Sequence, residues 1–258
     1  MHPLIRGWTD ITNRSPEANK RLGAVLAFVA GATNAGGFLA VGTYTSHMTG
    51  VVSALADNLV LGQLALAAAS LGALGAFLLG AMTSAWLVNW GLREKLASAY
   101  GLPLLLESAL LLTFGIFGAA ISMLSQFFVP VTVVLLCFIM GLQNAVITKI
   151  SKAEIRTTHV TGLVTDLGIE LGKLLYINRT QTNRTQTNPA EPVRANHPKL
   201  RLHLLLVSSF FIGAVCGALG FKFAGYITTV PLAVTLLLLV WRPVLHDVLA
   251  RRPHWRRL

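Results

Sequence analysis

Charged residues are scarce in this sequence, and acidic residues are the scarcest. Asp, Glu, Lys and Arg make up 12% of the 258 residues, with 10 acidic against 21 basic side chains. An average soluble domain has about twice that charged fraction. The mean hydropathy is +0.64. These values exclude an ordinary soluble protein, whose surface needs more charge than this chain supplies.

Cysteine and catalytic motifs are also nearly absent. The two cysteines, Cys137 and Cys216, both lie inside apolar runs, so we interpret them as packing residues rather than as a disulfide or a metal pair. The chain has no H-E-x-x-H, G-x-S-x-G or Walker motif and no metal-spaced cysteine set. We therefore predict no catalytic residues, no metal, no cofactor and no enzymatic activity.

Long apolar runs are the main feature of the chain. Six runs reach the roughly 20 residues that a membrane-spanning helix needs. The first is too long for a signal peptide and lacks a clear cleavage site, so we expect it to be retained. We predict an all-α integral membrane protein in contact with the lipid bilayer. The runs cover residues 22–42, 64–90, 103–125, 128–148, 202–221 and 223–241.

Basic residues flank these runs. Of the 21 Lys and Arg residues, 20 lie in five segments between or beyond the runs, and only Lys222 lies elsewhere. This distribution follows the positive-inside rule, so we predict no nucleic-acid partner. Six spans place all five segments in the cytoplasm, whereas eight spans would place 91–102 and 149–157 outside. We predict six spans with both termini cytoplasmic, including a basic N-terminus (1–21) and a basic tail (247–258).

Two further stretches, 46–62 and 159–176, look helical but are too short and too polar to span. The sixteen residues 47–62 of the first stretch rise only about 24 Å as a helix, less than the roughly 30 Å hydrocarbon core. Charged groups in lipid cost about 2.5 kcal/mol or more each. We therefore predict half-helices or re-entrant helices packed inside the protein. Their polar residues are Asp57 and Asn58 in the first stretch and Asp166 and Glu170 in the second.

The two short stretches begin with the same motif. The chain reads TSHMTG at 45–50 and TTHVTG at 157–162, and GATNAGG (31–37) upstream resembles GLQNAVI (141–147). We predict a first repeat over 22–125 and a second over 126–246, with a cytoplasmic linker at about 177–201. Three crossings in each copy make the second repeat inverted. Inverted repeats with interrupted helices are a recurrent transporter plan, with the binding site where the broken helices meet.

The chemistry of the motif suits a binding site. A helix that begins inside a membrane has unpaired N–H groups, which Thr and Ser hydroxyls can cap. The glycines permit close approach, the helix dipole favours an anion, and histidine titrates near neutral pH. We predict that both turns face one shared polar chamber. The candidate substrate-binding residues are Asn34, Thr45, Ser46, His47, Thr49, Gly50, Asn58, Asn144, Thr157, Thr158, His159, Thr161 and Gly162.

Ionisable residues follow each motif at helical spacing. Eleven residues turn a helix by about 1100°, which places His47 on one face with Asn58, and His159 with Glu170. Asp166 joins the second face. Such residues in a membrane protein indicate function by default, although a plain ion pair with Lys173 and a capping or packing role for the motif residues remain open. Glu107 is a weaker candidate for a role in the site. The proton-coupling candidates are His47, Asp57, His159, Asp166 and Glu170.

Two long motifs resemble a known family. NAGGFLAVGTYTSHMTG (34–50) and GLQNAVITKISKAEIRTTHVTGLVTDLGIELG (141–172) are similar to the YoaK-like family of bacterial inner-membrane proteins, a domain of unknown function. The resemblance implies six spans and a bacterial cytoplasmic membrane, and it brings no substrate.

Two functions fit these observations. The first is a secondary transporter or channel for a small solute, with a small anion or carboxylate favoured and proton coupling suggested by the histidine and acidic residues. The alternative is a non-transporting membrane scaffold or accessory subunit that docks a partner on the basic cytoplasmic loops. The sequence is also compatible with a homo-oligomer.

Overall fold

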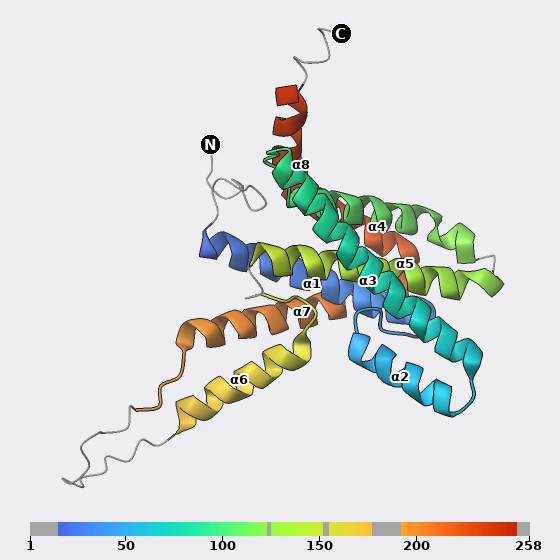
Figure 1. Cartoon of the computed structure of the whole chain (residues 1–258), viewed down its shortest axis with the longest axis horizontal. Helices are drawn as coiled ribbons and strands as arrows, with labels where there is room; N and C mark the ends of the chain where they lie inside the picture. The colour runs from blue at the N-terminus through green and yellow to red at the C-terminus, as the bar shows by residue number, and fades with distance from the viewer. Residues whose placement is uncertain (1–14, 123–124, 152–154, 177–191, 252–258) are drawn as a thin grey trace.

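The protein is helical throughout the part that the structure, a computed structural model, describes: residues 15–122, 125–151, 155–176 and 192–251. This part has eight α-helices, one 3-10 helix and no strand (Figure 1). The all-α prediction is confirmed. Most of the predicted basic N-terminus, linker and tail lie outside the described residues. The helices are α1 (Pro16–Val41), α2 (Met48–Val60), α3 (Leu64–Arg93), α4 (Gly101–Ser122), α5 (Ser125–Ile150), α6 (Val160–Leu175), α7 (His197–Ala224), η2 (Gly225–Thr228) and α8 (Thr229–Arg251).

Four of the six predicted apolar runs each lie almost entirely within one long helix. The run 103–125 extends past the end of α4, and the run 223–241 begins in α7 and crosses η2 into α8. Four helical segments of the described chain are long and apolar enough to cross a membrane: Pro16–Val41, Leu64–Arg93, Pro130–Ile150 and the continuous stretch His197–Ala250. The apolar part of α4, Gly101–Ile116, is shorter, as is α2. The hydropathy pattern of the sequence therefore located the long helices correctly, and the two polar stretches became the short helices α2 and α6.

Two pairs of long helices cross in backbone contact. The pattern Phe-x-x-Gly occurs four times in the sequence, once in each of α1, α3, α5 and α7. A Cβ atom on each of these glycines would overlap the carbonyl oxygen of a phenylalanine in the partner helix. Glycine is therefore required at each crossing, as in close-packed membrane helices. Gly31 faces Phe210 and Gly213 faces Phe28 in the α1–α7 pair; Gly141 faces Phe77 and Gly80 faces Phe138 in the α3–α5 pair.

Both of these pairs are parallel. Gly36, eight residues after Phe28, meets Phe221, eight residues after Gly213. In the other pair, Lys149 Nζ donates to Ala85 O at 3.3 Å, again eight residues beyond the glycine crossing. The same crossing is therefore built twice, from residues that are 110 positions apart in α1 and α5 and 133 positions apart in α3 and α7.

The remaining long helices, α4 and α8, pack antiparallel. Ser108 Oγ of α4 donates to Ala233 O at 2.7 Å, and Thr229 Oγ1 of α8 donates to Leu111 O at 2.8 Å. At the far end of α8, Asp247 accepts hydrogen bonds from Ser98 N at 2.8 Å and Ser98 Oγ at 2.6 Å. This carboxylate ties the link before α4 to the end of α8, so the pair is held by polar contacts at both ends.

The half-helices lie at the edge of the packed core, to which α6 contributes Leu163. The core is formed by leucine, isoleucine, valine and other apolar side chains from the long helices, mainly α1, α4, α5, α7 and α8. α2 packs mainly on α3 and has no buried residue, and α6 packs mainly on α7. Figure 1 shows them at opposite ends of the α1–α5 pair. The prediction that both half-helices are packed inside the protein is wrong for α2, which has no buried residue, and α6 buries only Leu163 and Glu170.

The glycine crossing can be tested within α3. Gly80→Ala should lower the melting temperature of the purified protein in detergent, because the added Cβ overlaps Phe138 O and the helices must move apart. Overpacking of this kind costs about 1–3 kcal/mol. Gly72→Ala is the matched control, since nothing lies within 4 Å of a Cβ there, and it should be neutral or slightly stabilising. Equal melting temperatures for the two variants would contradict the crossing.

Candidate functional site

The two histidine motifs form the same local structure. We name residues 45–50 the first histidine turn and residues 157–162 the second histidine turn. The threonine that opens each turn, Thr45 or Thr157, is fully buried, and the histidine, His47 or His159, is exposed. Burial matches at all six positions of the two turns. Both histidines are the N-cap residues of a half-helix, with similar backbone angles.

An asparagine of the preceding long helix holds each turn. Asn34 Oδ1 of α1 accepts hydrogen bonds from Ser46 N at 3.1 Å and Ser46 Oγ at 3.0 Å. Asn144 Oδ1 of α5 accepts one from Thr158 Oγ1 at 2.7 Å. These amides therefore satisfy polar groups of the turns, and neither asparagine lines either of the two pockets described below.

The predicted capping by hydroxyl groups is wrong. Ser46 and Thr158 donate to the asparagines, and Thr45 Oγ1 and Thr157 Oγ1 are buried without a hydrogen-bond partner. The histidines at the N-cap positions make no side-chain cap hydrogen bond. Each half-helix thus begins without a side-chain cap. In α2 the Met48 N–H donates to Ser46 O at 3.2 Å, and the other N–H groups of the first turns are available to a ligand or to water.

The glycine of each motif makes room for the histidine ring. A Cβ on Gly50 would lie 2.8 Å from His47 Nδ1, and a Cβ on Gly162 would overlap the ring of His159. The imidazole therefore lies back over the first turn of the half-helix. This explains the spacing of histidine and glycine better than the close helix approach that the sequence predicted. Thr49 and Thr161, at the remaining motif positions, are exposed.

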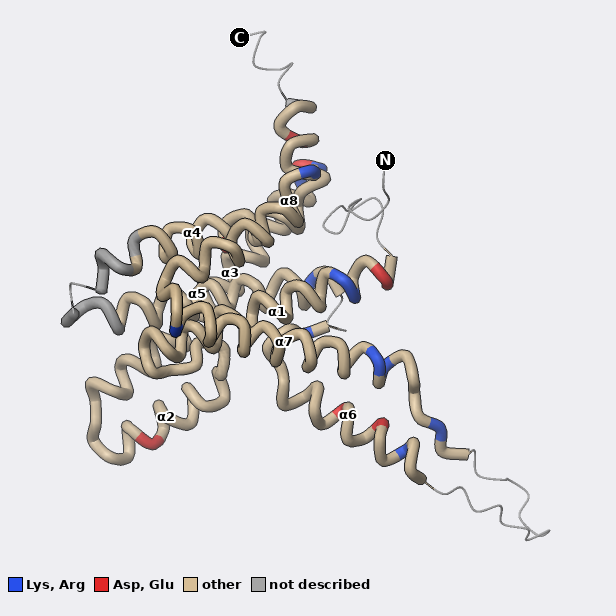
Figure 2. The backbone as a smooth tube through the Cα atoms, turned by 180° about the vertical axis from the view of Figure 1, so that it is seen from behind, with Lys and Arg blue, Asp and Glu red and all other residues tan. Residues whose placement is uncertain are grey.

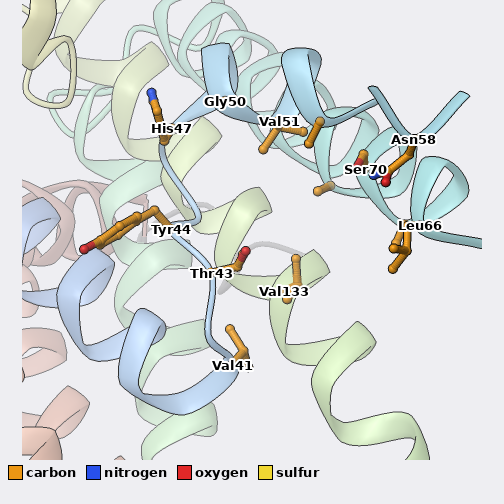
Figure 3. Close-up of a pocket in the computed structure, with 13 residues that line it drawn as sticks. Val41, Thr43, Tyr44, His47, Gly50, Val51, Asn58, Leu66, Ser70 and Val133 are labelled. Atoms are coloured by element: carbon orange, nitrogen blue, oxygen red, sulfur yellow. The ribbon is translucent and has the colours of Figure 1, made fainter. Parts of the chain in front are cut away.

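A pocket of about 430 Å³ opens beside the first histidine turn. Figure 3 shows its labelled side chains, which come from the end of α1, the link after it, α2 and α3, with Val133 from α5. His47 and Asn58 both line it, as their predicted shared face requires. The other lining residues are mostly apolar: Val41, Thr43, Tyr44, Gly50, Val51, Ala54, Leu66, Ala69, Ser70, Ala73 and Val133.

A second pocket, of about 350 Å³, lies between the second histidine turn, α6 and α7. Its lining is more polar, and it shares no residue with the first pocket. The predicted single chamber is therefore wrong. Its lining residues are Arg156, His159, Gly162, Leu163, Thr165, Asp166 and His203.

The packing of α1 on α5 explains the separation of the pockets. Gln143 Nε2 donates to Leu26 O at 3.1 Å, so these two positions are neighbours. The two helices run in opposite directions (Figure 1). Asn34 lies eight residues beyond Leu26, and Asn144 lies one residue beyond Gln143 on the opposite side. Nine residues of helix rise roughly 13 Å, so the asparagines hold the two turns at different levels.

The predicted acidic residues occupy different environments. Asp57 is exposed on α2 and does not line the first pocket. Asp166 lines the second pocket, and its side chain is 39% exposed. Asp166 Oδ2 lies 3.4 Å from Lys199 Nζ of α7, so its partner is not Lys173. Glu170 does not line the pocket at all. The predicted line from His159 through Asp166 to Glu170 is thus broken.

Glu170 attaches α6 to the start of α7. Its side chain is 3% exposed, and it accepts hydrogen bonds from Lys173 Nζ at 2.8 Å and from Asn196 N at 2.7 Å. These two bonds, the one from Lys173 first, lower the pKa of the Glu170 carboxyl below its ordinary value. A carboxylate held in its charged form is a poor proton carrier near neutral pH. Glu170 was predicted to be either a proton-coupling residue or the partner of Lys173 in an ion pair. The geometry favours the ion pair.

Sequence reasoning missed His203. This histidine lies in the apolar sequence of α7 and is only 4% exposed. It lines the second pocket, and its Nδ1 atom is buried without a hydrogen-bond partner. Asp166 Oδ2 lies 3.8 Å from this Nδ1 atom. A histidine within a predicted span was the available signal, because ionisable residues at such positions usually have a function.

Glu107 is not part of either pocket, and the described residues do not form a metal site. Glu107 is fully buried in α4, neither carboxyl oxygen has a hydrogen-bond partner, and it lines neither pocket. Within the described residues, no three His, Cys, Asp or Glu side chains are placed to hold a metal ion.

The fold and these pockets define a class: a helical membrane protein with two half-helices at opposite ends of its core. The comparison with family models is more specific. The chain belongs to the family described as "Protein of unknown function (DUF1275)", whose model matches residues 22–241. No curated protein and no solved structure matches the chain.

Removal of an asparagine should loosen only its own turn. Asn34→Leu leaves the Ser46 donors without an acceptor, which costs about 1–3 kcal/mol. Hydrogen–deuterium exchange of the Ser46 amide should accelerate by about tenfold or more, since 1.4 kcal/mol corresponds to a factor of ten. Asn144→Leu is the matched variant and should act on the second histidine turn alone. Faster exchange in both turns of either variant would show that the asparagines stabilise the whole fold instead.

Proposed function

We propose that the chain crosses a bacterial cytoplasmic membrane six times, as two inverted three-span repeats with both termini in the cytoplasm. The twofold occurrence of the Phe-x-x-Gly crossing and of the histidine turn supports the repeat. Figure 2 shows most of the described Lys and Arg residues near the ends where α1 and α7 begin and α8 ends. That end would face the cytoplasm by the positive-inside rule. The bacterial location and the more specific YoaK-like assignment rest on the sequence resemblance.

We further propose a secondary transporter or channel for a small solute, with a small anion or carboxylate favoured. One observation carries this proposal: an uncapped half-helix with an exposed histidine is built twice, each time beside a pocket. The long helices α1 and α7, by contrast, each begin with a capping side chain, Ser15 or Asn196. Interrupted helices of this kind bind substrates with their N-termini in known transporters.

The two pockets change how transport would work. They share no residue, so the solute would pass from one half-site to the other instead of occupying one chamber. Each half-helix contacts mainly one long helix, α3 or α7. Rocking of the α2–α3 unit against the α6–α7 unit is therefore the motion that the fold favours, as in other inverted-repeat transporters. The two exposed histidines would carry protons between the half-sites and the two compartments.

A scaffold remains the second candidate, and one observation favours it. The outer faces of the half-helices are apolar and exposed: Val60 is 88% exposed and Leu175 is 79% exposed. A partner helix could cover these faces without any transport. The two functions differ in whether the purified protein alone moves a solute across a membrane.

Thiol labelling tests the topology. In a variant without Cys137 and Cys216, Lys222→Cys should react with a membrane-impermeant maleimide added to intact cells. Glu94→Cys, in the link after α3, should react only after the cells are opened. Both positions are exposed in the structure, so a difference reports the side of the membrane. Labelling of Glu94→Cys in intact cells would refute the six-span arrangement.

Liposome flux tests the function. Reconstituted protein should move at least one anion from a panel of acetate, lactate, formate and phosphate, followed with an internal pH-sensitive dye. The double variant His47→Gln/His159→Gln should lower the rate by tenfold or more, because both half-sites lose a donor. His246→Gln is the matched control, since its side chain is 74% exposed near the end of α8, outside both pockets. Absence of flux for the whole panel would favour the scaffold.

A further inference from the structure

The two pockets differ in charge although their histidine turns match. The first pocket is lined mostly by apolar residues, and its charged or titratable members are Tyr44 and His47. The second pocket is lined by Arg156, His159, Asp166 and His203. The two histidine turns therefore have similar backbone geometry, but the side chains that line the two pockets differ in charge. The second pocket alone has the charges that select an ionic ligand.

His203 indicates that the second pocket is built for a ligand. Its side chain is 5% exposed, yet Nδ1 has no hydrogen-bond partner in the structure. A buried polar atom without a partner costs about 1–3 kcal/mol, and native structures rarely leave one unexplained. Because His203 lines the pocket, a ligand atom inside the pocket can supply the missing hydrogen bond.

The start of α6 supplies further donors to the same pocket. The helix has 16 residues and no side-chain cap. Its first backbone bond runs from Leu163 N to His159 O at 3.1 Å, so the amides of residues 160–162 precede the helical ladder. Gly162 and Leu163 line the pocket. Free N–H groups at the positive end of a helix dipole bind anions.

The charge balance also favours an anion. Asp166 is the one acidic residue among the lining residues, and Lys199 Nζ lies 3.4 Å from its carboxylate. Arg156 is exposed beside the pocket and adds a positive charge. Its planar guanidinium group matches two oxygens of a carboxylate or phosphate. The two histidines add hydrogen-bond donors, and they add positive charge when protonated.

We infer that the second pocket binds a small oxyanion, a carboxylate or a phosphate, between Arg156, His203 and the N-terminus of α6. His159 and Asp166 line the same space, and Asp166 weakens the binding through like charge. A pocket of about 350 Å³ admits an anion of a few heavy atoms. The cytoplasmic position of this site rests on the proposed function, but the binding itself does not.

Isothermal titration calorimetry of the purified full chain in detergent tests the site with two probes, inorganic phosphate and acetate. At least one should bind saturably, and the pair shows which oxyanion is preferred. Arg156→Gln and His203→Gln should each weaken binding by tenfold or more. Asp166→Asn should strengthen it several-fold, because it removes the like charge. His246→Gln, outside the pocket, should bind as the unchanged protein does.

A protection assay keeps the test valid if a variant is unstable. Thr165→Cys, in a variant without the two native cysteines, places a thiol on the pocket lining, and the bound anion should slow its reaction with a maleimide. Failure of both anions to bind and to protect would overturn the inference even if liposomes show flux. Binding that survives both Arg156→Gln and His203→Gln would overturn it too. Binding without flux would support the site and reject the transporter.

Discussion

Backbone contact at the four glycines is the constraint on which the architecture depends. In hydrocarbon, apolar side chains gain little by leaving lipid, so close helix contact has to come from packing. At each crossing a glycine allows the carbonyl of a phenylalanine to approach where a Cβ would stand. The α1–α7 and α3–α5 pairs are fixed in this way. Each half-helix follows one member of such a pair and packs on a member of the other.

The position of the turns follows from this arrangement. Asn34 and Asn144 stand on α1 and α5, three residues after the crossing glycines Gly31 and Gly141. One helical turn therefore separates the crossing from the hydrogen bonds that hold each histidine turn. Because α1 and α5 are antiparallel, the same construction places the two turns at different levels. Two separate pockets result from the repeat itself, whatever residues line them.

The sequence predicted the helices and the repeated turn because both depend on local patterns. Apolar length located the long helices, and helical periodicity placed His47 and Asn58 on one pocket. Periodicity alone does not identify the neighbour that a helical face meets. Glu170 was expected beside His159, but its carboxylate pairs with Lys173 and with the amide of Asn196, 26 residues later in the chain. The Phe-x-x-Gly patterns and His203 can be read in the sequence. Their roles could not be predicted, because these roles depend on contacts with residues of other helices.

The two half-helices are also held by different forces, and this difference bears on motion. α6 is tied to α7 by the carboxylates of Asp166 and Glu170, which pair with Lys199 and the Asn196 amide. α2 has one carboxylate, Asp57, which is exposed, and its contact with α3 is largely apolar. Ionic contacts weaken with salt and with ligand charge, whereas apolar contacts do not. An anion bound in the second pocket, as inferred above, would repel Asp166, whose carboxylate pairs with Lys199. The α6–α7 unit is therefore the half of the molecule whose packing a charged solute can change.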